Sequence, residues 1–176
     1  KRLILLVFLG GIGSAFLAIV AEVSVLGTKG FELGLVVTGI PPQLPVFLSF
    51  LMIGLIEEYA KYLPVKFFIL KRAEFNEPID AMIYMMTSAL GFAAIENALF
   101  IFPLFYQNLF LGLELTANRF LGANLLHALS SGIVGFFLAR AWFLPDENGP
   151  PRRTHSIALG IMLAALLHAA FNYFIL

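Results

Sequence analysis

Three ionisable residues stand close together in the stretch Gly54-Leu55-Ile56-Glu57-Glu58-Tyr59-Ala60-Lys61. The surrounding run, residues 45–70, is otherwise apolar enough to span a bilayer. If they faced lipid, two carboxylates and one ammonium would cost roughly 8–10 kcal/mol, at about 2.5–3.5 kcal/mol each, which is comparable to the stability of a whole domain. We therefore expect them to face protein or water, as a buried carboxylate centre suited to acid–base or ligand chemistry. A charge cluster at an interfacial helix end is the alternative.

Helical geometry assigns these residues different partners. Lys61 follows the two carboxylates by four and three residues, so it can reach both. Neighbouring residues of a helix differ in direction by about 100°, so Glu57 and Glu58 are not expected to point at one spot. One should work at a polar centre, while the other pairs with Lys61 and anchors a neighbouring helix.

Glu96, His127 and His168 each lie within a further apolar run. We measured the depth of each of these residues, and of Glu57, from the end of its apolar run that adjoins a basic loop. All four lie about 13 to 17 residues from that end, or roughly 20–26 Å into a hydrocarbon core of about 30 Å. Each alone has a structural alternative, such as a hydrogen bond between Glu96-Asn97 and a neighbouring helix. Their common depth favours one shared site.

Two carboxylates and two imidazoles are side chains that can activate and position water. A glutamate removes a proton from the water, and the imidazoles either bind a Lewis-acid metal or stabilise a developing oxyanion. Ser130 and Ser131 follow His127 too closely on one helix for a catalytic triad. The chain also has no cysteine. The pattern therefore indicates hydrolysis by activated water.

The composition predicts an all-α integral membrane protein. Hydrophobic residues make up 60% of the 176 residues and charged residues 12%, and the mean hydropathy is +0.92. Lys plus Arg and Asp plus Glu are equal at 11 each, so no charge excess indicates a nucleic-acid partner. We expect one membrane-embedded domain over residues 1–176, a polytopic helical bundle of about five transmembrane helices around a polar intramembrane site. The spans are predicted near 3–25, 45–70, 79–103, 119–144 and 155–175.

Small residues recur in the first span, among them Gly10, Gly11 and Ala15, and allow another helix to approach closely. We expect this span to cover the site-bearing helices from outside. Residues 33–40 are predicted to form an interfacial or re-entrant segment, and residues 104–118 to lie along the interface.

Basic residues favour one side of the predicted topology. Eight lie on the side of the N-terminus: Lys1, Arg2, Lys66, Lys71, Arg72, Arg140, Arg152 and Arg153. Only Lys29 and Arg119 lie on the other side. The positive-inside rule then predicts a multi-pass protein of the cell membrane with a cytoplasmic N-terminus and an extracytoplasmic C-terminus.

Four motifs in order resemble those of the PrsW family of intramembrane proteases, which is similar in turn to the CAAX prenyl proteases and the bacterial Abi proteins. They are Glu57-Glu58-x-x-Lys61, Phe92-x-x-x-Glu96-Asn97, His127 and His168-x-x-x-Asn172. The first span, with Glu22 near its outer end, also looks like the N-terminal region of the family. Members often have a further helix upstream, which the given chain is expected to lack.

The resemblance implies an endopeptidase that cuts single-pass membrane proteins, such as anti-sigma factors, at an extracytoplasmic (site-1) position. The CAAX proteases have histidine where this chain has Glu96, which argues against a prenylated substrate. The expected catalytic set is Glu57, Glu58, Glu96, His127, His168 and Asn172, supported by Lys61, Asn97 and Phe92. Glu57 would activate the water, and Asn172 would orient His168 or donate to the oxyanion.

Two mechanisms follow from this set. In one, Glu96, His127 and His168 bind a divalent metal such as zinc and Glu57 is the base. In the other, two glutamates hold the water and the histidines stabilise the oxyanion without metal. Outside proteolysis, a proton- or cation-coupled transporter or a catalytically silent membrane scaffold would also place ionisable residues at this depth.

Overall fold

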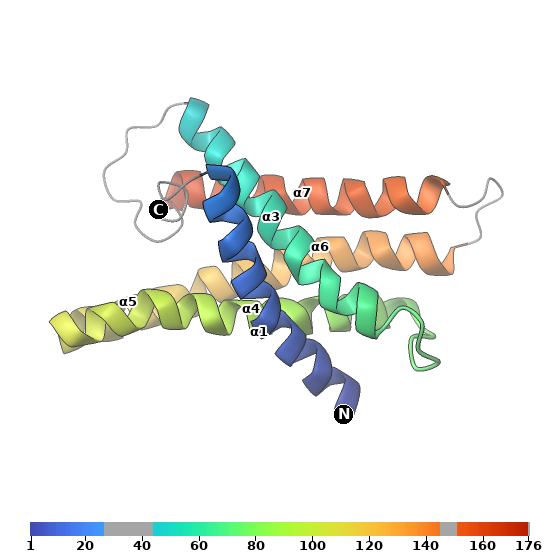
Figure 1. Cartoon of the computed structure of the whole chain (residues 1–176), viewed down its shortest axis with the longest axis horizontal. Helices are drawn as coiled ribbons and strands as arrows, with labels where there is room; N and C mark the ends of the chain where they lie inside the picture. Colours follow the sequence, from blue (N-terminus) through green and yellow to red (C-terminus); the bar gives the residue numbers. More distant parts are fainter. Residues whose placement is uncertain (27–43, 145–150, 176) are drawn as a thin grey trace.

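The computed structural model describes residues 1–26, 44–144 and 151–175, and these are almost entirely helical (Figure 1). The helices are α1 (Arg2–Leu26), α3 (Leu44–Phe68), α4 (Pro78–Gln107), α5 (Leu109–Leu121), α6 (Ala123–Phe143) and α7 (Pro151–Ile175). The described residues contain no strand. The prediction of an all-α membrane bundle is therefore confirmed. The predicted segment 33–40 lies outside the described residues.

Four of these helices are long and apolar enough to cross a membrane, namely Arg2–Leu26, Pro78–Pro103, Ala123–Phe143 and Arg153–Phe174. The fifth predicted span corresponds to α3, which has the necessary length of 25 residues. It differs from the others because Glu57, Glu58 and Lys61 lie in its middle. A helix with three central charges depends on its neighbours for stability in lipid.

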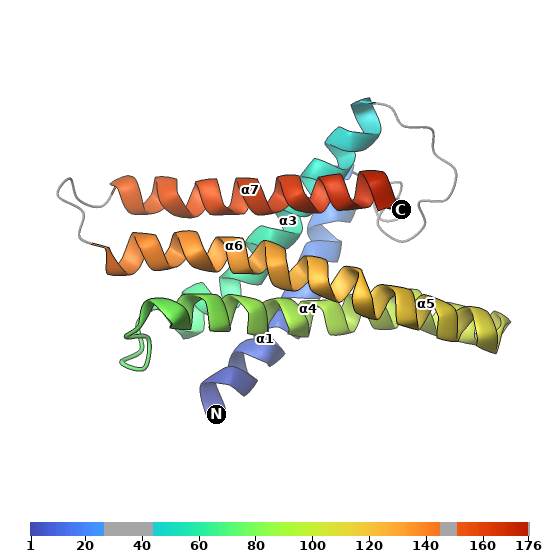
Figure 2. The same ribbon diagram turned by 180° about the vertical axis from the view of Figure 1, so that it is seen from behind.

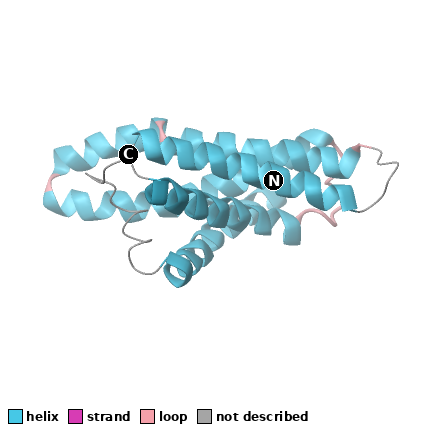
Figure 3. Cartoon of the chain, turned by 90° about the horizontal axis from the view of Figure 1, so that it is seen from above, coloured by secondary structure: helices cyan, strands magenta, loops and turns pink. Residues whose placement is uncertain are grey.

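The helices form a layer with two helices crossing it. The helices α4, α6 and α7 run side by side, with α6 packed between the other two (Figure 1). The helices α1 and α3 cross this layer obliquely, and comparison of Figures 1 and 2 places both on the same face. There α1 packs mainly against α4, and α3 against α7. Seen from above in Figure 3, the bundle is elongated along the direction of the layer.

Glycines allow α1 and α4 to touch along their backbones. A Cβ atom added at Gly11 would lie 2.1 Å from the carbonyl oxygen of Ser88, and one added at Gly91 would lie 2.1 Å from that of Phe8. Each helix thus presents a glycine to the backbone of the other, the arrangement expected where small residues drive packing in membranes. The predicted role of Gly11 is confirmed. In contrast, Gly13 has no such neighbour within 4 Å.

The region after the third predicted span differs from expectation. The helix α4 continues past Pro103 to Gln107, although a proline removes one backbone hydrogen bond and crowds the preceding turn. Residues 109–121 form the separate helix α5, whose Gly112 packs on the ring of Phe105 in α4. Residues 104–118 therefore divide between two helices, and the next span begins at Ala123 and not at residue 119. Their position along the interface stays a prediction.

Helix ends that are predicted to lie on the same side of the membrane also lie toward the same end of the bundle. The N-terminus, the end of α3, the end of α6 and the beginning of α7 lie toward one end of the long axis, and the C-terminus and the α4–α5 turn lie toward the other (Figure 1). The basic residues assigned to the N-terminal side lie in or next to the first group of helix ends.

Replacing Gly11 by alanine tests the contact between α1 and α4. The added methyl group would meet backbone atoms of Ser88, which cannot turn aside, so we expect a loss of about 1–3 kcal/mol of stability. The matched Gly13→Ala change meets open space and should be neutral or stabilise the helix by up to about 1 kcal/mol. Thermal unfolding of the purified protein in detergent measures both. Equal effects of the two changes would contradict this packing.

Candidate active site

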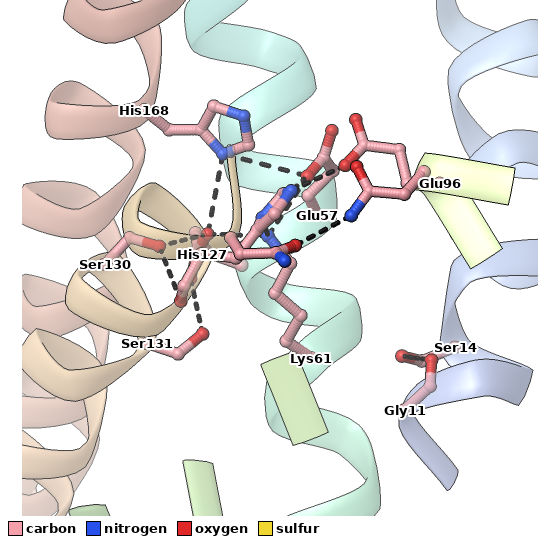
Figure 4. A network of polar contacts seen from close by, with 12 residues as sticks. Gly11, Ser14, Glu57, Lys61, Glu96, His127, Ser130, Ser131 and His168 are labelled. Atoms are coloured by element: carbon pink, nitrogen blue, oxygen red, sulfur yellow. Dashed lines mark hydrogen bonds and ion pairs between the residues drawn. The ribbon is translucent and has the colours of Figure 1, made fainter. Parts of the chain in front are cut away.

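The ammonium of Lys61 lies at the centre of a buried polar cluster contributed by four helices (Figure 4). Its Nζ donates to Glu57 Oε2 at 3.0 Å and to Glu58 Oε1 at 2.8 Å. Both partners lie on the same helix, at the i−4 and i−3 positions. The prediction that Lys61 reaches both carboxylates is confirmed. The ammonium also lies 4.5 Å from the centre of the Phe92 ring, a favourable cation–π distance.

Glu58 links α3 to α6. Its carboxylate is fully buried and accepts hydrogen bonds from Ser130 Oγ at 2.8 Å and Ser131 Oγ at 3.1 Å. With the bond from Lys61, both oxygens of this carboxylate have partners, as a buried charge requires. The expectation that one of the two glutamates anchors a neighbouring helix is confirmed for Glu58. Lys61, however, pairs with both glutamates and not with the anchoring one alone.

His127 lies between Lys61 and Glu96. Its Nδ1 is 2.8 Å from Lys61 Nζ, and its Nε2 is 2.5 Å from Glu96 Oε2. An ammonium can only donate, so Nδ1 is the acceptor and the ring proton is on Nε2, which donates to Glu96. One chain of contacts therefore runs from α3 through α6 to α4. Asn97 adds a second link between α4 and α6, since its amide donates to Asn124 Oδ1 at 2.7 Å.

His168 of α7 faces both carboxylates of α3. Its Nδ1 is 3.7 Å from Glu57 Oε2 and 3.5 Å from Glu58 Oε1, and its ring centre is 5.4 Å from that of His127. The expectation that Glu57 and Glu58 do not point at one spot is therefore wrong. The two side chains bend from neighbouring positions on α3 toward the helix α7, which approaches α3 closely at Gly54. Among the described residues, His168 Nδ1 is a buried atom without a hydrogen-bond partner.

The structure thus brings together Glu57, Glu96, His127 and His168, as their common depth predicts (Figure 4). Asn172 lies one turn beyond His168 on α7 and is buried. It makes no hydrogen bond to His168 or to any other residue that the structure describes. Its predicted role in orienting His168 has no support from a direct contact.

A cavity adjoins this cluster between α1, α3 and α4. Its polar lining residues are Glu22, Glu57 and Glu96, and the others are Ala15, Ala18, Ile19, Phe92, Ile95, Leu99 and Phe100. The positions open to the centre of a water molecule fill about 40 Å³, more than the roughly 10–15 Å³ that one water needs. The site can therefore hold water next to Glu57.

The first helix forms part of this wall, which corrects the expectation that it only covers the site from outside. Sequence reasoning did not assign Glu22 to the site. Its signal was available, because Glu22 is the only acidic residue in the first span and an ionisable residue within a span indicates a functional position.

Glu57, His127 and His168 could hold a metal ion, since one ligand atom from each lies within 4.8 Å of the others and all three residues are buried. One carboxylate oxygen and two imidazole nitrogens form a donor set typical of catalytic zinc. The buried Nδ1 of His168, which makes no hydrogen bond with the residues that the structure describes, fits such a ligand role. The carboxylate of this group is that of Glu57, whereas the expected metal ligands are Glu96, His127 and His168. Which of the two carboxylates would bind the metal stays a prediction.

Comparison with known protein families shows which family this chain belongs to. A family model described as "PrsW family intramembrane metalloprotease" matches residues 1–176. The chain belongs to the PrsW family. The four motifs lie in order on α3, α4, α6 and α7, and all of them fall within this match.

Several curated relatives carry the name "Protease PrsW". The protein of Geobacillus kaustophilus (strain HTA426) is 32% identical over 132 residues, which cover 75% of this chain and 53% of that protein. The proteins of Clostridioides difficile (strain 630) and Bacillus subtilis (strain 168) are 28% and 29% identical, over 74% and 72% of this chain and 52% and 53% of theirs. The chain therefore spans about half the length of these PrsW relatives. No solved structure matches the chain.

Replacing Ser130 or Ser131 by alanine tests the link between α3 and α6. Each change removes one donor from a fully buried carboxylate, so we expect about 1–3 kcal/mol of lost stability for each. Ser24→Ala is the matched control, because Ser24 is exposed and bonds only to its own helix, at Val20 O. It should change stability by less than about 0.5 kcal/mol. Three equal shifts in Tm would argue against the role assigned to Glu58.

Proposed function

We propose that this chain is the catalytic part of an intramembrane endopeptidase, which hydrolyses a peptide bond of a membrane-anchored protein with water activated by Glu57. The observation that carries the proposal is the buried carboxylate of Glu57 at the wall of a water-sized cavity, with His127 and His168 within 3.9 Å and 3.7 Å of its Oε2. The PrsW family membership supports this reading.

Glu57 is the proposed general base. Its contacts with Lys61, His127 and His168 all involve Oε2, which leaves Oε1 to take a proton from a water in the cavity. The activated water attacks the carbonyl carbon of the peptide bond, and the proton held on Glu57 passes to the leaving nitrogen as the C–N bond breaks. Lys61 and Glu58 position Glu57 in this scheme. The imidazole of His168 lies beside the base, where it can stabilise the developing oxyanion, and that of His127 can do so once its Nε2 proton is turned from Glu96 to the substrate.

A bound divalent metal, with zinc as the proposed ion, would be held by both histidines and one glutamate. The chemistry that such an ion supplies when bound is Lewis-acid polarisation of a carbonyl oxygen. If Glu57 is the third ligand, Glu96 is the carboxylate left as base; if Glu96 is the ligand, Glu57 keeps that role. Charge supports a cation here, because in the described cluster one ammonium, that of Lys61, binds the two carboxylates of Glu57 and Glu58.

The proposed substrate is a single-pass membrane protein of the anti-sigma-factor type, cut at a site-1 position. The proposed location is the cell membrane, with the N-terminus in the cytoplasm and the C-terminus outside. The basic residues near the N-terminal side of the bundle support this orientation.

Replacing Glu57 by glutamine tests the base. The amide keeps an oxygen for Lys61 but cannot accept a proton from water, so cleavage of a transmembrane peptide in liposomes should fall at least about 100-fold. The control is Glu74→Gln, which changes an exposed carboxylate in the turn between α3 and α4. Cleavage by the Glu57 variant within a few fold of the unaltered protein would refute the assignment. A transporter or a silent scaffold would show no cleavage in any form.

The metal proposal is tested by elemental analysis of the purified protein. We expect about one zinc per chain, lost in His168→Ala because a ligand is removed, and retained in His155→Ala, which changes an exposed histidine at the beginning of α7. Exhaustive chelation should abolish cleavage. If the protein contains no stoichiometric metal and cleaves unimpaired after chelation, only the mechanism without metal is left.

A further inference from the structure

Glu22 is a buried carboxyl group that the proposed mechanism does not use. It lies near the end of α1, and only 7% of its surface is exposed. It lines the same cavity as Glu57 and Glu96. The remaining lining side chains carry no polar group, so these three glutamates supply every polar side-chain atom of the cavity wall.

The three glutamates differ in whether they already have partners. Glu57 binds Lys61 at 3.0 Å, and Glu96 binds His127 at 2.5 Å. Glu22 has no hydrogen bond or ion pair with any residue that the structure describes. A buried carboxyl group without a hydrogen-bond partner lowers stability, so Glu22 does not hold α1 in place as Glu58 holds α6.

Cleavage of a peptide bond within a membrane requires hydrogen-bond partners for the substrate backbone, and a buried carboxyl group can provide them. In hydrocarbon, each backbone N–H and C=O must have a partner, and a helix provides it only while it stays wound. Hydrolysis needs the carbonyl carbon to be accessible, so the substrate has to unwind and loses these partners. The apolar walls formed by Ala15, Ala18 and Ile95 cannot replace them. A carboxyl group can, because it accepts from N–H and, when protonated, donates to C=O.

We propose that Glu22 is a substrate-positioning residue, whose carboxyl group hydrogen-bonds the backbone of the unwound substrate segment where that segment meets the cavity between α1 and α4. The inference rests on the proposed function, since it assigns the cavity to the substrate of that reaction. It gives α1 a part in substrate binding and limits the partner to a transmembrane segment that can unwind.

The test measures binding separately from cleavage. The protein carries Glu57→Gln, so that no turnover occurs, and is reconstituted in nanodiscs. Two labelled Leu/Ala transmembrane peptides of about 22 residues are compared, one with a central Gly-Pro that breaks the helix and one without it. In the Glu57→Gln protein, the broken peptide should bind more tightly. Adding Glu22→Leu should weaken its binding by about 10-fold and leave the unbroken peptide unchanged, whereas Glu22→Gln, which keeps a donor and an acceptor, should stay within about 3-fold.

A second measurement separates positioning from a structural role. Leucine in place of an unpartnered buried carboxyl should leave the Tm unchanged or raise it, while binding of the broken peptide falls. A lower Tm together with weaker binding of both peptides would overturn the proposal, and so would unchanged binding of the broken peptide. Absence of cleavage by the protein with Glu57 intact, with the expected binding pattern, would instead count against the protease function and leave the role of Glu22 in backbone binding standing.

Discussion

The cost of placing charge in hydrocarbon governs the architecture of this protein. Three ionisable residues in the middle of α3 would each cost about 2.5–3.5 kcal/mol if exposed to lipid. They are stable because Lys61 binds both carboxylates at 3.0 Å and 2.8 Å and also contacts His127 at 2.8 Å. Every helix that borders α3 in the site supplies either a polar partner for this group or a small residue that permits close approach.

Close packing and polar contacts depend on each other in this arrangement. Gly54 lets α7 approach α3, with a hypothetical Cβ atom only 3.2 Å from the Cβ atom of His168. That approach brings the imidazole of His168 to the carboxylates of Glu57 and Glu58. In the same way, the backbone contacts of Gly11 with Ser88 and of Gly91 with Phe8 bring α1 against α4. Side chains of α1 beyond these contacts form a wall of the cavity. The polar side chains of the site therefore depend on the glycines that let their helices approach one another.

Much of the site could be predicted from the sequence, because membrane helices have few alternatives for ionisable residues. The convergence of Glu57, Glu96, His127 and His168 follows from their depth and from the cost of charge in lipid. The approach of both Glu57 and Glu58 to His168 could not be predicted, since it depends on side-chain rotamers and on the crossing of α3 and α7. The position of Glu22 in the cavity depends on the tilt of α1, which its almost uniformly apolar sequence does not specify. Likewise, the turn before α5 depends on contacts such as that of Gly112 with Phe105.

The partners of α3 have a consequence for biosynthesis. Lys61 meets Glu57 and Glu58 within one turn of its own helix, but His127 follows Lys61 by 66 residues and Ser130 follows Glu58 by 72. At about 5–20 residues per second, a ribosome needs several seconds to make that interval. During this time the ion pairs within α3 are the partners available from the helix itself. The i,i+3 and i,i+4 spacing of the lysine thus lets α3 pair its own charges before α6 and α7 have been made.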